Sequence, residues 1–204
     1  MIINLLQADG HTAQLDRLRK MDTERDDDLT EALESQLPCR MEKVRTPAID
    51  AIGVNIWLDV CHNEQGFEKV LAQFEKDEDK KGRPLTVVCG YSKEKNIDAM
   101  LQMLATSDAV REVYPISCNH FRLSSLSELQ AKITKVSSDR QIFKQPFATI
   151  EETLLHLLLR PDAQDKNVLI CGSFYLMANV RKALKYPHGK LDECDEDLLN
   201  SVTN

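Results

Sequence analysis

From about residue 52 onward, short apolar runs alternate with longer segments in which apolar residues recur every three or four positions. A continuous apolar run is typical of a buried strand, and an apolar stripe at helical spacing is typical of an amphipathic helix. The predicted strands lie at residues 52–60, 85–90, 110–117 and 167–173. The predicted helices lie at residues 64–79, 95–107, 124–138, 149–160 and 174–186. This alternation predicts an α/β, Rossmann-like three-layer domain with a mostly parallel sheet.

The flanking parts of the chain follow other patterns. Residues 15–21 and 28–37 predict short helices, and residues 38–46 lead into an edge strand. We predict an N-terminal helical extension or remnant linker at residues 1–35, the α/β domain at 36–188 and an acidic tail at 189–204. The N-terminus lacks a basic region and a small-residue cleavage site, so it predicts neither a signal peptide nor a transit peptide. No apolar stretch reaches the ~18 residues that a membrane span needs.

Charge and cysteine usage narrow the class of protein. The formal net charge of −7 argues against nucleic-acid binding, which usually needs a clustered basic surface. The six cysteines are widely spaced and form no C-x-x-C pair. This spacing favours a reduced, intracellular protein, either cytoplasmic or mitochondrial. Neither the cysteines nor the five histidines pair at ligand spacing, so no metal site is predicted.

Polar residues follow each of the four predicted strands. The segments are DVCHN at 59–63, CGYSKEKN at 89–96, SCNHFR at 117–122 and CGSFY at 171–175. In open parallel sheets, ligands bind at the carboxyl ends of the strands. The four segments are therefore predicted to share one edge of the sheet and to form a binding rim there.

Each candidate side chain on this rim has a functional and a structural interpretation. Asp59 could accept hydrogen bonds from ribose hydroxyls, or it could serve the turn or cap the helix that follows. His62 could donate to a phosphate or a carboxylate, or it could be a partly buried histidine that stabilises the turn. His120 and Arg122 form a second candidate contact for anions.

The CGSFY segment combines a glycine with a hydroxyl at a predicted helix start. Gly172 would let a ligand approach the backbone, and Ser173 would help the helix N-terminus to bind a carboxylate or phosphate. The alternative is a tight turn at Gly172 and an N-cap at Ser173. Lys95 offers a cation near the second strand, although such lysines are commonly only solvated. The sequence contains neither a G-x-x-x-x-G-K-[ST] loop nor a G-x-G-x-x-G motif, so it does not predict a triphosphate cradle.

Five segments carry, in chain order, a resemblance to a known family. They are PCRME at 38–42, LDVCHNEQGF at 58–67, CGYSKEKNI at 89–97, NHFRL at 119–123 and ICGSFYLMANVRKAL at 170–184. Together they resemble the C-terminal domain of folylpolyglutamate synthase and dihydrofolate synthase, in the Mur ligase superfamily. The resemblance covers about residues 35 to 186 and implies the Mur ligase C-terminal type of fold.

The resemblance also implies an activity. Family members are ATP-dependent ligases that convert a folate carboxylate to an acyl phosphate, which L-glutamate then attacks. A P-loop N-terminal domain binds most of the ATP and Mg²⁺, and the C-terminal domain closes over them. The residue roles that the resemblance implies are nucleotide binding by Arg40, Asp59 and Asn63, glutamate binding by His62, Gly172 and Ser173, and catalysis by His62 and Lys95.

Four departures from the family pattern accompany these matches. Cys39 replaces a glycine, Cys61 an alanine, Glu64 a proline and Asn96 an aspartate. The chain also lacks the P-loop. One hypothesis is therefore a ligase domain that needs a separate P-loop domain as its partner. The alternative is a catalytically inactive homologue that serves as a structural or regulatory subunit of a larger complex. A free-standing binder of amino acid or nucleotide is a third, weaker possibility.

Overall fold

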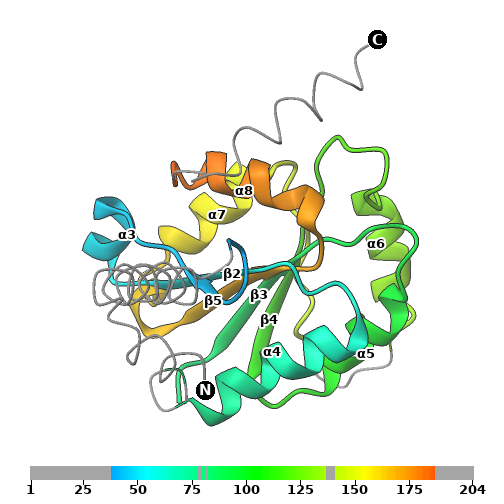
Figure 1. The fold of residues 1–204 in the computed structure, drawn as a ribbon, viewed down its shortest axis with the longest axis horizontal. Coiled ribbons are helices and arrows are strands. Elements are labelled where there is room, and N and C mark those ends of the chain that lie inside the picture. The colour runs from blue at the N-terminus through cyan, green and yellow to red at the C-terminus, as the bar shows by residue number, and fades with distance from the viewer. Residues whose placement is uncertain (1–37, 78–79, 81, 137–140, 187–204) are drawn as a thin grey trace, which may run out of the picture. The chain divides into compact units, whose positions relative to one another are not determined.

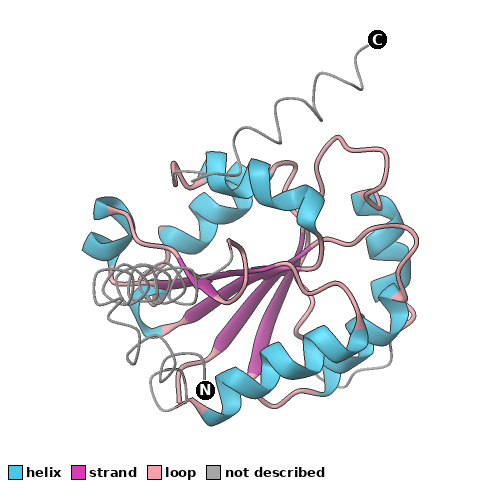
Figure 2. Ribbon diagram, viewed as in Figure 1, coloured by secondary structure: helices cyan, strands magenta, loops and turns pink. Residues whose placement is uncertain are grey.

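The computed structural model describes residues 38–77, 80, 82–136 and 141–186, which form a five-stranded sheet with helices on both faces (Figures 1 and 2). The sheet order is β1-β2-β5-β3-β4, in which β1 is antiparallel to β2 and the other neighbours are parallel. The strands are β1 (Glu42–Lys43), β2 (Asn55–Asp59), β3 (Leu85–Cys89), β4 (Val110–Pro115) and β5 (Asn167–Cys171). The predicted three-layer α/β fold is confirmed.

The helices are α3 (Pro47–Ile52), α4 (Glu64–Lys76), α5 (Ile97–Thr106), α6 (Leu126–Ile133), α7 (Ile150–Leu158) and α8 (Met177–Ala183), with 3-10 turns η1 (Ala163–Asp165) and η2 (Phe174–Leu176). Helices α4 to α8 fall within the five predicted segments, with shorter bounds, and α3 was not predicted. The helices predicted at residues 15–21 and 28–37 and the acidic tail lie outside the described residues. The domain limits at residues 35 and 188 remain predictions.

Three local predictions needed correction. The strand predicted at 52–60 is β2, which begins only at Asn55 because the short helix α3 precedes it. Thr46 caps the start of α3, Pro47 is its first residue, and Gly53 ends it with φ of 79°. The segment predicted as one helix at 174–186 divides into η2 and α8. The apolar run LLHLLL at 154–159 predicts His156 in the core or at its border, but His156 is exposed and lies against the rings of Tyr114 and Phe147.

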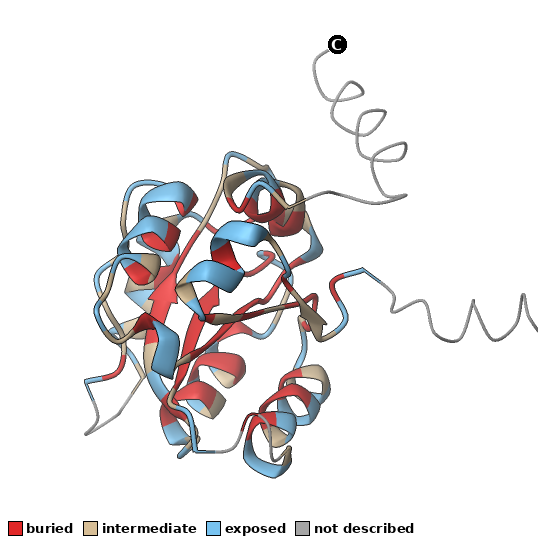
Figure 3. Cartoon of the chain, turned by 90° about the vertical axis from the view of Figure 1, so that its left-hand side faces the viewer, coloured by how far each residue is buried: buried red, intermediate tan, exposed pale blue. Residues whose placement is uncertain are grey.

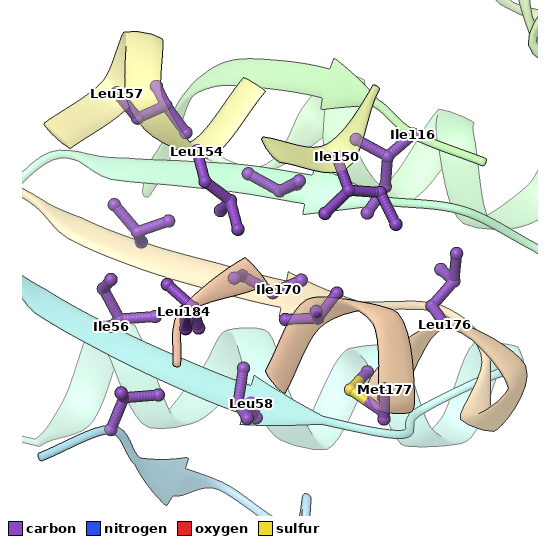
Figure 4. Close-up of a cluster of buried hydrophobic side chains, with 14 of the residues drawn as sticks. Ile56, Leu58, Ile116, Ile150, Leu154, Leu157, Ile170, Leu176, Met177 and Leu184 are labelled. Atoms are coloured by element: carbon purple, nitrogen blue, oxygen red, sulfur yellow. The ribbon is translucent and has the colours of Figure 1, made fainter. Parts of the chain in front are cut away.

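The sheet is buried on both faces because helices cover each side. Helices α7 and α8 lie on one face, and α4, α5 and α6 lie on the other (Figure 1). Figure 3 shows the strands buried and the outer faces of the helices exposed. Alternate strand residues enter opposite cores: Ile56 and Leu58 face α7 and α8, and Trp57 faces α4. Figure 4 shows apolar side chains of the sheet packed against those of α7 and α8, including Ile56, Leu58, Ile150, Leu154, Ile170, Met177 and Leu184.

Candidate functional site at the carboxyl edge of the sheet

The four polar segments that follow β2, β3, β4 and β5 meet at one edge of the sheet. Cys171 at the end of β5 is in register with Asp59 on one side and with Cys89 on the other, and Cys89 is in register with Pro115. The four parallel strands therefore end level with one another. The segment at 38–42 joins the same edge, because the Met41 amide donates to the Asp59 carboxylate. We call this edge the rim.

The glycines of the rim bring segments of the chain itself together. Gly172 has φ of 107°, and a side chain there would collide with the carbonyl of Gly90 and lie tightly against the ring of Tyr91. A side chain at Gly90 would collide with the carbonyl of Ile116. The space beside Gly172 is therefore filled by the protein. This geometry matches the tight-turn interpretation of Gly172.

Ser173 lies beneath the surface of the rim. Ser173 is 1% exposed, and its Oγ accepts a hydrogen bond from the Tyr175 amide at 3.3 Å. The Oγ of Ser92, also buried, lies 3.0 Å from the Ser173 Oγ. Ser173 thus caps the turn η2, as its structural interpretation predicts, and its hydroxyl shares a hydrogen bond with the Ser92 hydroxyl, in which either group can be the donor. The sequence places Ser92 in the segment after β3 but gives no sign of its contact with Ser173, 81 positions away.

Asp59 is also buried, at 4% exposure, with both carboxylate oxygens in use. Oδ2 accepts from the Met41 amide at 2.8 Å, and Oδ1 accepts from the Cys61 amide at 2.7 Å. Asp59 does not cap the helix that follows. That position belongs to Asn63, an exposed residue whose Oδ1 accepts from the Gly66 amide at 2.8 Å.

His62 and Lys95 are half-buried and reach the surface of the rim. The Nδ1 atom of His62 lies 2.9 Å from the Val60 carbonyl oxygen. A carbonyl oxygen only accepts, so Nδ1 carries a proton. In the neutral imidazole the other ring nitrogen, Nε2, is then a hydrogen-bond acceptor.

Two of the departures from the family pattern contact each other. The Asn96 Nδ2 group donates to the Glu64 Oε1 atom at 2.7 Å, which ties the segment after β2 to the segment after β3. An aspartate at position 96 would place two carboxylates together. The asparagine thus accommodates Glu64 on the rim.

Arg40 is exposed on a loop with unusual backbone geometry. Its neighbours Cys39 and Met41 have φ values of 56° and 46°, in the left-handed region that favours glycine. This geometry explains why the family pattern has a glycine where this chain has Cys39. Burial raises the pKa of the Cys39 thiol to about 11, so the thiol stays protonated at neutral pH.

A buried ion pair fixes the end of the Arg40 loop. Arg181 donates from two nitrogens to Glu42, at 2.8 and 3.2 Å, and its guanidinium lies over the ring of Tyr186. The Glu42 carboxylate also accepts from the Cys39 amide at 2.7 Å. Sequence reasoning assigned no role to Glu42 or Arg181, although both stand inside matched segments. The sign that the sequence offered of their importance was that both lie in segments that resemble the family pattern.

His120 and Arg122 lie on the segment between β4 and α6, where aromatic rings constrain them. His120 stacks on Tyr175 at 4.3 Å between ring centroids, and Arg122 donates to the Tyr175 hydroxyl at 2.9 Å. Burial and the nearby Arg122 charge lower the pKa of His120, which favours its neutral form. An open depression of about 650 Å³ beside them is lined by Lys93, Ser117, Asn119, His120, Phe121 and Ser125.

The described residues contain no group of three or more histidines, cysteines or acids placed to hold a metal ion. Among the described helices, none is both long and apolar enough to cross a membrane.

Residues 42–185 match the family model for the C-terminal domain of dihydrofolate synthetase. The chain belongs to this family. The match covers the whole sheet and the segments that follow the four parallel strands, and it confirms the family resemblance; residues 38–41, which include Arg40, lie outside the match. No curated protein matches the chain.

Solved structures share the fold of this family member. FolC of E. coli in complex with DHPP and ADP is 20% identical, with a TM-score of 0.58. A bifunctional folylpolyglutamate synthase/dihydrofolate synthase from Yersinia pestis is 24% identical, with a TM-score of 0.55. A folylpolyglutamate synthase from Thermotoga maritima is 18% identical, with a TM-score of 0.57. Each match covers 74% of this chain, and the chain covers 32%, 32% and 31% of those proteins respectively. The chain thus spans about a third of their length.

Proposed function

We propose that this domain closes over ATP and L-glutamate in an ATP-dependent folate–glutamate ligase and that a P-loop domain completes it. The observation that carries the proposal is the convergence of Arg40, His62, Asn63 and Lys95 at one rim, on segments far apart in the chain. Two of these side chains are cationic, and the ligands concerned are anions. A related bifunctional synthase was solved with Mn, AMPPNP and L-glutamate bound.

In the proposed reaction, an oxygen of the folate γ-carboxylate attacks the γ-phosphorus of ATP, and ADP leaves. The amino nitrogen of glutamate then attacks the acyl carbon, the bond from that carbon to the phosphate oxygen breaks, and inorganic phosphate leaves as the amine loses a proton. Mg²⁺ would neutralise phosphate charge in the first step. By the family resemblance, the P-loop domain would hold the metal and most of the nucleotide.

The rim residues receive roles that suit their surroundings. Arg40 is exposed and suits nucleotide phosphates, and Asn63, which is also exposed, is assigned to the same ligand. Lys95 would stabilise the charge of the acyl phosphate. The Val60 carbonyl fixes the proton on Nδ1 of His62, so the neutral ring offers Nε2 to the amino group of glutamate. Ser173 and Gly172, which are buried, would shape the glutamate site from beneath.

One observation favours the alternative, an inactive homologue that serves as a structural or regulatory subunit. Asp59 and Ser173 are almost completely buried, and both are engaged by hydrogen bonds within the chain. A subunit kept for its scaffold would retain such contacts without any ligand.

The test is incorporation of labelled glutamate into a folate with MgATP, measured for the chain alone and with a P-loop ligase domain. The proposal expects incorporation only in the mixture. Arg40→Ala and His62→Ala should each lower it by about tenfold or more. The matched control is Arg83→Ala, because Arg83 is also exposed but precedes β3 at the opposite edge. Inactivity of the mixture, together with no protection of the chain by ATP or glutamate, would favour the structural subunit.

A further inference from the structure

The carboxylate of Asp59 joins two separate segments of the rim. Oδ2 accepts from Met41, which precedes β1, and Oδ1 accepts from Cys61, which follows β2. Met41 is the neighbour of Arg40, and Cys61 is the neighbour of His62. One buried group therefore fixes the backbone beside two residues of the proposed site.

The segment around Arg40 needs such an anchor. Cys39 and Met41 on either side of Arg40 adopt left-handed backbone conformations, which cost non-glycine residues energy and persist only when their surroundings enforce them. The Asp59 carboxylate holds the Met41 amide, and the Val60 amide donates to the Cys39 carbonyl at 2.9 Å. The loop is thus tied to the end of β2 on both sides of Arg40.

We propose that Asp59 is a positioning residue, whose buried carboxylate sets the placement of Arg40 relative to His62 and does not itself contact the nucleotide. This inference rests on the proposed function, because it concerns the same site. It assigns Asp59 a role other than the ribose contact that the family resemblance implies.

The chemistry of the side chain makes the role specific to a carboxylate. Two amide donors need two acceptor oxygens, which an ionised aspartate provides. Asparagine keeps one acceptor, and its NH₂ group would face the other amide donor. Alanine leaves both donors without the carboxylate. Because a hydrogen bond to a charged group is among the stronger ones in proteins, its loss should accelerate local amide exchange by roughly 10- to 100-fold.

The first experiment measures hydrogen exchange and amide spectra of the chain alone, for the wild type, Asp59→Asn and Asp59→Ala. The Met41 and Cys61 amides should be protected in the wild type, one of them should lose protection in Asp59→Asn, and both should in Asp59→Ala. The backbone signals of Arg40 and His62 should shift in both variants. The control is Thr46→Ala, which removes a cap from the Ile49 amide and should leave the rim signals unchanged.

The second experiment measures kcat and KM in the mixture with the P-loop domain, for Asp59→Asn, Arg40→Ala and the double variant. Positioning predicts strong coupling, in which Arg40→Ala costs about tenfold or more in the wild type but less than about twofold in Asp59→Asn. It also predicts that the preference for ATP over 2′-deoxy-ATP and 3′-deoxy-ATP survives in Asp59→Asn. Loss of that preference identifies a ribose contact and overturns the inference, and so do additive effects of the two substitutions.

The two experiments separate the inference from the proposed function. If the wild-type mixture is inactive, the ligase proposal fails, but the amide spectra still decide the placement. Coupled shifts at Arg40 and His62 then support the positioning role without catalysis. Unchanged signals there in Asp59→Ala refute it, whether or not the mixture is active.

Discussion

Replacing Arg181 with methionine should strongly destabilise the domain. Arg181 and Glu42 form a forked ion pair whose side chains are 5% and 15% exposed. Removing one partner of a buried pair costs about 3–5 kcal/mol, because the other charge remains buried and unpaired. Glu42 keeps its hydrogen bond from the Cys39 amide, so we expect the lower end of this range, about 3 kcal/mol. In a domain of this size, that loss lowers Tm by about 6–12 °C.

Urea unfolding of the chain measures this effect directly, and an unchanged m-value would assign it to stability alone. The double variant Glu42→Leu with Arg181→Met removes both charges and should recover most of the loss. The control Arg45→Met breaks the exposed pair with Asp50, which should cost less than about 1 kcal/mol. A loss below about 1 kcal/mol for Arg181→Met, or a double variant no more stable than Arg181→Met, would refute the reasoning.

Three further predictions test individual contacts. In urea unfolding, Cys39→Gly should be at least as stable as Cys39→Ala, because glycine adopts the left-handed backbone conformation at position 39 without strain. Glycine is ordinarily the less stable of the two, so a glycine variant less stable than the alanine variant would contradict this prediction. Asn96→Asp should lower stability near neutral pH by about 0.5–1 kcal/mol, because it sets a carboxylate against Glu64, and adding Glu64→Gln should restore it. Hydrogen bonds from Arg160 and Lys166 lower the pKa of Asp162 from 3.8 to about 2. The ionised Asp162 therefore stabilises the fold above about pH 4, and this stabilisation is lost as the pH falls towards 2. Asp162→Asn should make the free energy of unfolding depend less on pH in that window, and an unchanged pH dependence would count against this prediction.

The sequence alone determined the four parallel strands, most of the helices and the common edge where the strands end. A strand such as residues 85–89 is buried on both faces, so its sequence is a continuous apolar run. Helix α4 is buried on one face only, so its apolar residues recur every three or four positions. Parallel strands also bring their carboxyl ends together wherever they occur, so His62, Lys95 and Ser173 could be assigned to one rim before their contacts were known. These predictions succeeded because they depend on local periodicity and on the geometry of parallel sheets.

Only the tertiary structure decided what each side chain of the rim contacts. Within its own segment Asp59 could be a ribose ligand or a turn residue, whereas the structure shows its carboxylate accepting a hydrogen bond from Met41, 18 positions earlier in the chain. Ser173 depends in the same way on Ser92, and Glu42 on Arg181, 139 positions away. Spacing along the chain carries no information about such partners, because a hydrogen bond or an ion pair forms only after folding brings distant segments to within about 3 Å.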